Sequence, residues 1–181
     1  MPIGRALEDV IVHELSTLGF DPFFAAQLPP SGDGGVPARV AAEHRDLYEV
    51  WAETGTGLAR LAGRLRRDSG DAGPPGVGDW VLLRTAPGPD GTSVIERVLE
   101  RRTVFTRGAA GRESRVQVVA ANVDLVLVVC GLDADYNPHR IERYLARVWA
   151  SGARPIVILN KADLCPDAEV RVAEVAEHAV G

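Results

Sequence analysis

The chain has 181 residues, of which 46% are hydrophobic and 25% charged, and its formal net charge is −5. This length allows one large or two small domains with a buried core, and the composition is ordinary for a globular protein. No apolar run reaches the roughly 18 residues of a membrane-spanning helix, and no signal-peptide layout opens the chain, so we expect a soluble protein of the cytoplasm without a membrane partner. Cys130 and Cys165 form no C-x-x-C pair, and we predict no metal site.

Residues 1–35 are predicted to form a helix and a linker. Apolar residues recur at helical spacing over residues 5–18, namely Leu7, Val10, Ile11, Leu15 and Leu18. Phe20, Phe23 and Phe24 follow, and we expect this aromatic cluster to dock on the next domain rather than bind a ligand. The segment from Pro29 to Gly35 is rich in turn residues.

Residues 36–106 change to a period of two, which is typical of strands. Five short strand-like segments, separated by strong turns, begin near Val36, Leu47, Leu58, Asp79 and Ser93. This pattern predicts an OB-type five-stranded barrel, with an SH3-like barrel as the alternative. Barrels of this type often bind RNA, although fold alone supports that function only weakly.

Residues 107–118 are predicted to be a linker, and a basic stretch surrounds it. Residues 97–115 hold six arginines against two acidic residues. Such a stretch can bind phosphates of RNA, or it can be an ordinary solvated face. The candidate RNA-binding residues are Arg101, Arg102, Arg107, Arg112 and Arg115.

Residues 119–181 have the pattern of an α/β domain. The run from Val123 to Cys130 is almost continuously apolar, as in a central parallel strand. Asn137-Pro138 predicts a helix N-terminus, Gly152 predicts its end, and 156–159 form a second buried strand. The strand, helix and strand predict a βαβ unit.

The second strand runs directly into Asn160-Lys161-Ala162-Asp163, which has the form N-K-x-D of a guanine-reading loop. A carboxylate such as Asp163 can accept the N1–H and N2 amine of guanine together, a donor pair that adenine lacks. Lys161 is the only lysine among 20 basic residues, which suggests a position where arginine does not substitute. Ligands bind at the carboxyl ends of strands in such sheets, so the position suits the motif.

Two motifs of ordinary GTPases have no counterpart in the chain. A phosphate loop needs G-x-x-x-x-G-K-S/T, but the one lysine follows Asn160. No Asp has Gly three residues later, so D-x-x-G is also absent. Either the N-K-x-D match is fortuitous, or the order of motifs is permuted. We therefore predict no catalytic residue here.

Five stretches together resemble the ribosome small-subunit-dependent GTPase A family, whose members are circularly permuted GTPases. The stretches are Arg39–Arg45, Gly78–Val81, Val119–Asp124, Ile141–Leu145 and Leu159–Leu164. The resemblance spans roughly residues 36–164, the N-terminal half of such a protein. It implies an OB-type barrel followed by the first βαβ unit of a circularly permuted P-loop GTPase domain, which would be incomplete in residues 119–181.

The resemblance also implies GTP hydrolysis during late maturation of the small (30S) ribosomal subunit, with that subunit and its rRNA as partners. Guanine recognition carries over to Asn160, Lys161 and Asp163. GTP or GDP with Mg²⁺ would bind the complete domain, and zinc would bind only a C-terminal domain that has no counterpart here. We expect a monomer.

Two other interpretations remain. The chain can be a non-catalytic OB-fold RNA-binding module with a structural α/β remnant, or residues 160–163 can be an ordinary loop. The three tryptophans, Trp51, Trp80 and Trp149, occupy expected core positions, which favours packing over base stacking.

Overall fold

The computed structural model describes residues 14–30, 34–67, 73–89, 91–108 and 116–178. They divide into two compact units, Met1–Arg101 with Arg107–Ala121, and Arg102–Thr106 with Asn122–Gly181. Most of the helix predicted over residues 5–18 lies outside the described residues, and residues 15–19 form turns.

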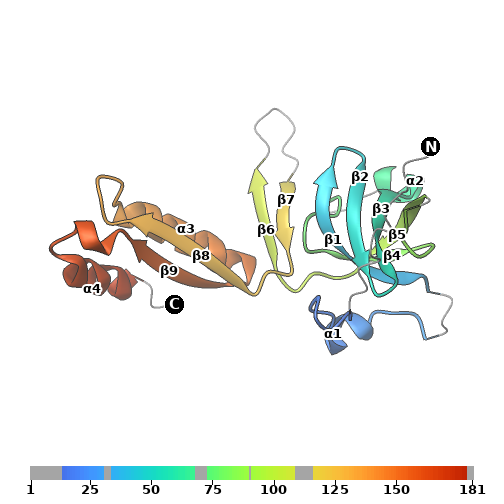
Figure 1. Ribbon diagram of the computed structural model, residues 1–181, viewed down its shortest axis with the longest axis horizontal. Helices are drawn as coiled ribbons and strands as arrows, with labels where there is room; N and C mark the ends of the chain where they lie inside the picture. The colour runs from blue at the N-terminus through green and yellow to red at the C-terminus, as the bar shows by residue number, and fades with distance from the viewer. Residues whose placement is uncertain (1–13, 31–33, 68–72, 90, 109–115, 179–181) are drawn as a thin grey trace, which may run out of the picture. The chain divides into compact units, whose positions relative to one another are not determined.

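The first unit is built on a closed five-stranded barrel, as predicted (Figure 1). Its strands pair in the order β1-β2-β3-β5-β4, and β4 also pairs with β1. The pairings are antiparallel except that β3 runs parallel to β5. The strands are β1 (Val36–His44), β2 (Leu47–Ala52), β3 (Gly55–Leu61), β4 (Trp80–Leu83) and β5 (Thr92–Val98). A short helix, α2 (Gly63–Arg67), follows β3.

Alternate residues of these strands fill the barrel, which is the physical basis of the period of two in the sequence. The interior is fully buried and apolar. It consists of Ala38, Val40, Tyr48, Val50, Ala52, Ala59, Val81, Leu83 and Ile95.

The aromatic segment near the N-terminus packs on the barrel, as expected. Asp21 caps α1 (Pro22–Ala25) by accepting a hydrogen bond from the Phe23 N–H. The Phe20 ring meets Trp80 edge-on at 4.8 Å between centroids, and Phe24 lies 5.8 Å from the same ring. Trp80 is therefore a core residue, which confirms the prediction for this tryptophan.

The same prediction was wrong for Trp51 and Trp149, which are 36% and 39% exposed. Trp51 alternates with the buried Val50 and Ala52 on β2, so its ring lies on the outer face of the barrel. Trp149 follows the buried Val148 on its helix and lies away from the apolar side.

The segment predicted as a linker is bordered by two paired strands, β6 (Val104–Gly108) and β7 (Val116–Ala121). Local packing explains this difference. Val118 is buried against Gly76, where an added Cβ would lie 2.7 Å from the valine side chain. Ala121 donates its N–H to the Val77 carbonyl at 2.8 Å.

The second unit has the predicted strand, helix and strand, followed by a further helix. These are β8 (Leu125–Gly131), α3 (Pro138–Ser151), β9 (Arg154–Asn160), the 3-10 turn η1 (Ala162–Leu164) and α4 (Ala168–His178). Asn137 caps α3 through its side chain, and Gly152 ends it at φ 85°, which confirms both predicted boundaries.

One face of the β8–β9 pair is covered by helices α3 and α4 (Figure 1). Cys130 contributes to this core, together with Ile141, Leu145 and Val175 from the helices. The opposite face carries apolar side chains that are exposed in the described chain, namely Leu125, Leu127, Val129, Ile156 and Ile158. The almost continuous apolar run of β8 predicts burial on both faces of the strand pair, and among the described residues only one face is buried.

Candidate guanine-recognition loop

Parallel pairing of β8 and β9 places Asn160 at the carboxyl end of the pair, as predicted. In the register, Gly131 lies opposite Asn160, and both are the last residues of their strands. The Asn160 carbonyl accepts the Leu132 N–H at 2.8 Å, so the two loops that leave the strands begin side by side. Ligands commonly bind at this edge of an α/β sheet.

Backbone geometry makes Lys161 an unusual residue in this loop. Its φ of 60° and ψ of 34° lie in the left-handed region, which a residue with a side chain rarely adopts. The Asn160 side-chain oxygen accepts the Lys161 N–H at 2.9 Å, and the Lys161 carbonyl accepts the Leu164 N–H at 3.1 Å. These bonds stabilise a conformation of a kind that is concentrated at functional sites.

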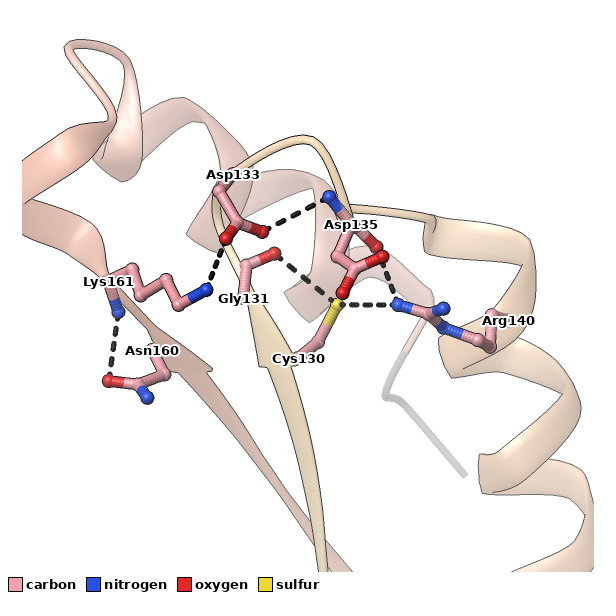
Figure 2. A network of polar contacts seen from close by, with 7 residues as sticks. All are labelled: Cys130, Gly131, Asp133, Asp135, Arg140, Asn160 and Lys161. Carbon is pink, nitrogen blue, oxygen red and sulfur yellow. Dashed lines mark hydrogen bonds and ion pairs between the residues drawn. The ribbon is translucent and has the colours of Figure 1, made fainter.

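The Lys161 ammonium donates a hydrogen bond to the Asp133 carboxylate, which comes from the β8–α3 loop (Figure 2). This bond raises the pKa of Lys161, and Coulomb attraction to the same carboxylate adds to the effect. It likewise holds the pKa of Asp133 below its usual range, with help from the Asp135 N–H. Both groups therefore stay charged over a wide range of pH.

The β8–α3 loop holds Asp133 in place through its own bonds. An Asp133 oxygen accepts the Asp135 N–H at 3.1 Å, while the Asp135 carbonyl accepts from the Arg140 guanidinium at 2.5 Å. The same guanidinium lies 3.9 Å from the Cys130 sulfur, as Figure 2 shows. Gly131 leaves the necessary space, because an added Cβ would lie 2.8 Å from an Asp133 carboxylate oxygen.

Asp163 lies in the first turn of η1 and is exposed. Within the described part of the chain, its carboxylate has no hydrogen-bond partner, in contrast to Asp133. A carboxylate with both oxygens open can accept two adjacent N–H donors at once. The donor pair on the edge of guanine fits this arrangement.

Sequence reasoning missed Asp133. Residue 133 is 28 positions from Lys161, and no local motif joins them; only the strand register brings their loops together. The signal available in the sequence was its position just past an expected buried strand, where polar side chains face ligands.

The structure gives Arg101 a role inside the barrel unit. Its guanidinium forms a two-pronged contact with Asp79, Nε to Oδ1 at 2.8 Å and a terminal nitrogen to Oδ2 at 2.7 Å. The Asp79 side chain is fully buried, and that of Arg101 is 10% exposed. The Gly76 N–H gives the same carboxylate a third hydrogen bond at 2.8 Å.

The other candidate RNA-binding arginines differ in setting. Arg102 is exposed, and its backbone N–H donates to the Asn122 side chain at 2.8 Å. Arg107 is exposed and donates from Nε to Gln117 at 2.9 Å. Arg112 and Arg115 lie outside the described residues.

The described residues contain no group of three or more His, Cys, Asp or Glu side chains that could hold a metal ion. None of the helices described is long and apolar enough to cross a membrane.

Comparison with known proteins gives one consistent family. A family model described as RsgA GTPase matches residues 98–181. The small ribosomal subunit biogenesis GTPase RsgA of Opitutus terrae is 46% identical over 170 residues, which are 89% of this chain and 46% of that protein. The protein of the same name from Syntrophotalea carbinolica is 41% identical over 157 residues, which are 83% and 43% of the two chains. The chain thus spans less than half the length of these relatives.

Two solved structures share the fold. YjeQ from Thermotoga maritima is 26% identical, with a TM-score of 0.58 over 78% of this chain and 47% of that one. YloQ, described as a circularly permuted GTPase, has a TM-score of 0.58 at 20% identity, over 82% and 50% of the two chains. The chain therefore belongs to the RsgA GTPase family, and within it carries the barrel and the loop of Asn160, Lys161 and Asp163.

Proposed function

We propose that this chain supplies guanine recognition and RNA binding to a GTPase that acts in biogenesis of the small ribosomal subunit. The observation that carries guanine recognition is the exposed Asp163 carboxylate, which has no partner among the described residues, next to Asn160 and Lys161 at the carboxyl end of β9. The names of the curated relatives support the process.

Each residue of the loop has a distinct part in this proposal. Asp163 accepts N1–H and the N2 amine of guanine, while Asn160 bonds the loop backbone and the base. The aliphatic stem of Lys161 lies along the flat face of the base. Adenine offers Asp163 no such donor pair, so a desolvated carboxylate would stay unpaired at a cost of about 1–3 kcal/mol. This difference gives the loop its selectivity.

The test is a titration of the ¹⁵N-labelled chain with GDP and, separately, with ADP. GDP should shift the backbone signals of residues 160–163 at millimolar concentrations, whereas ADP should leave them unchanged. Asp163→Asn should reverse the preference from GDP toward XDP, because an amide N–H can meet the C2 carbonyl of xanthine. Equal shifts with GDP and ADP, or an unchanged preference in the variant, would remove Asp163 as the reader.

Hydrolysis by this chain alone is not part of the proposal. The phosphates and Mg²⁺ would be held by a phosphate loop, for which residues 1–181 provide no G-x-x-x-x-G-K-S/T sequence. Zinc would belong to a further domain of the complete family protein. We expect GTP turnover by the purified chain to equal the background rate, and turnover above background would contradict this assignment.

Binding of rRNA is the second part, and the closed barrel together with the exposed Arg102 and Arg107 favours it. Arg102 and Arg107 are the candidate phosphate contacts among the described residues. Replacing both with Gln should weaken binding to small-subunit rRNA and flatten its salt dependence, since fewer counterions are released on binding when phosphate contacts are lost. An unchanged salt slope would return both residues to solvated surface. We propose that the chain acts as a monomer in the cytoplasm.

A further inference from the structure

The Lys161 side chain reaches from the loop of residues 160–163 to the β8–α3 loop, where the Asp133 carboxylate holds its ammonium group (Figure 2). The two loops meet because Gly131 and Asn160 are paired at the ends of β8 and β9. The aliphatic stem of Lys161 is therefore anchored at both ends, by its own backbone and by the carboxylate. A lysine stem without the second anchor is flexible.

This ion pair contributes little to the stability of the fold. The Lys161 side chain is 49% exposed and that of Asp133 is 27% exposed, and ion pairs exposed to this degree are weak stabilisers. The left-handed backbone of Lys161 is held by other bonds. The Asn160 side chain accepts the Lys161 N–H, and the Lys161 carbonyl accepts the Leu164 N–H. What depends on Asp133 is the direction of the Lys161 side chain.

Asp133 is itself fixed by contacts within the second unit. Its carboxylate accepts the Asp135 N–H, and the Arg140 guanidinium of α3 donates to the Asp135 carbonyl, so the loop is tied to the helix. Gly131 leaves room for the carboxylate, because an added Cβ would lie 2.8 Å from one of its oxygens. The anchor for the lysine is thus in place without a bound ligand, which is the condition for preorganised binding.

We propose that Asp133 is a positioning residue for guanine-nucleotide binding, which fixes the Lys161 stem where the flat face of the base packs. Asp133 does not touch the base and acts through Lys161. The inference rests on the proposed guanine recognition by residues 160–163 and adds to it a residue from a different loop. Asp163 selects the base, whereas Asp133 lowers the entropy cost of binding, because the stem is ordered before the nucleotide arrives.

The expected effect of losing this anchor follows from the cost of ordering one long side chain on binding, which corresponds to roughly 2- to 12-fold in affinity. Electrostatics alone predicts the opposite sign. Removing a carboxylate close to an anionic nucleotide reduces repulsion and should strengthen binding. Weaker binding by a variant that lacks the Asp133 charge is therefore not an effect of net charge.

The test is a GDP titration of the ¹⁵N-labelled intact chain, followed through the backbone signals of residues 160–163. Asp133→Asn should weaken GDP binding roughly 2- to 12-fold. Gly131→Ala keeps every charge, but its Cβ displaces the end of the Asp133 side chain, so it should also weaken binding. Asp124→Asn is the matched control. It removes the same charge from an exposed residue just before β8, at the opposite end of that strand, and should leave affinity unchanged.

A double-mutant cycle separates positioning through Lys161 from a general disturbance of the loop. Lys161→Met keeps an apolar stem and removes the ammonium group, so it should weaken GDP binding to an extent similar to Asp133→Asn. Adding Asp133→Asn to Lys161→Met should cause no further loss. If the two losses multiply instead, Asp133 affects binding by a route other than Lys161, and the positioning role is wrong.

The outcomes distinguish this inference from the proposed function. If the wild type prefers GDP over ADP while Asp133→Asn binds GDP as tightly or more tightly, Asp133 is not a positioning residue, but Asp163 remains the reader. If the wild type binds GDP no better than ADP, guanine recognition fails and the positioning role fails with it. A loss of equal size in Asp124→Asn would assign the effect to charge and would also overturn the positioning role.

Discussion

Removal of the Arg101 guanidinium should destabilise the barrel unit severely. In Arg101→Met the aliphatic stem is kept, but the fully buried Asp79 carboxylate loses both charged hydrogen bonds and, among the described residues, keeps the Gly76 N–H alone. Breaking a buried ion pair by removing one partner costs about 3–5 kcal/mol, because it leaves an uncompensated buried charge. We take the lower end of this range, about 3 kcal/mol, because the Arg101 side chain is 10% exposed to solvent.

The corresponding fall in melting temperature is large enough to measure easily. A domain of about 100 residues loses roughly 4–8 °C of Tm for each kcal/mol, so we expect a fall of about 12–24 °C. Circular dichroism melts of the intact chain provide the measurement, and urea titration gives the free energy of unfolding. Asp79→Asn combined with Arg101→Met should be more stable than Arg101→Met alone, since the buried charge is then removed.

Arg84→Met is the matched control, because its ion pair with Glu96 is exposed, with 61% and 39% of the two side chains accessible. An exposed pair of this kind contributes about 0–1 kcal/mol. If Arg101→Met melts within a few degrees of the wild type, or no lower than Arg84→Met, the contact with Asp79 does not stabilise the barrel. Such a result would restore Arg101 as a candidate for RNA binding alone.

Two further predictions concern single contacts. Asp133→Asn should lower the Lys161 pKa toward its ordinary value. Asp135→Asn should lower it less, because Asp135 acts only through weaker Coulomb attraction. Reductive ¹³C-methylation followed by NMR measures the Lys161 pKa directly, since Lys161 is the chain's only lysine. In the wild type the contact should be lost only as pH falls through the depressed Asp133 pKa or rises through the elevated Lys161 pKa, and a Lys161 signal that titrates identically in all three proteins would contradict it. Gly78→Ala should destabilise the barrel unit by more than about 1 kcal/mol, because φ at Gly78 is 90° and the new Cβ would lie 2.1 Å from the Ala121 carbonyl oxygen. A Tm equal to that of the wild type would show that the backbone at Gly78 can shift freely.

Local patterns in the sequence were sufficient to predict most of the elements. The period of two and the turns between segments together located the five barrel strands, because alternate side chains of a strand must face the same interior. Asn137-Pro138 and Gly152 located the ends of α3, since capping depends on residues at the helix terminus itself. The position of Asn160 at the end of a parallel strand followed from the apolar run before it.

The failed prediction for Trp51 and the strands that adjoin the expected linker concern which face a residue presents and which partner it meets. Trp51 is apolar and lies in a strand, yet the alternation places it with the outward residues of β2. The segment around 107–118 contains paired strands because Val118 and Ala121 have neighbours far away in the sequence, at Gly76 and Val77. The first relation follows from the alternation along β2 itself, whereas the second cannot be read from spacing within one segment.

The sequence by itself determined the strands of the barrel, the βαβ unit and the Asn160–Asp163 loop, because each depends on side chains a few residues apart. Only the tertiary structure decided that Arg101 belongs to Asp79, 22 positions away, and that Lys161 meets Asp133, 28 positions away. Both contacts depend on how distant strands pair, and that pairing is a property of the closed barrel and of the β8–β9 register rather than of any local motif.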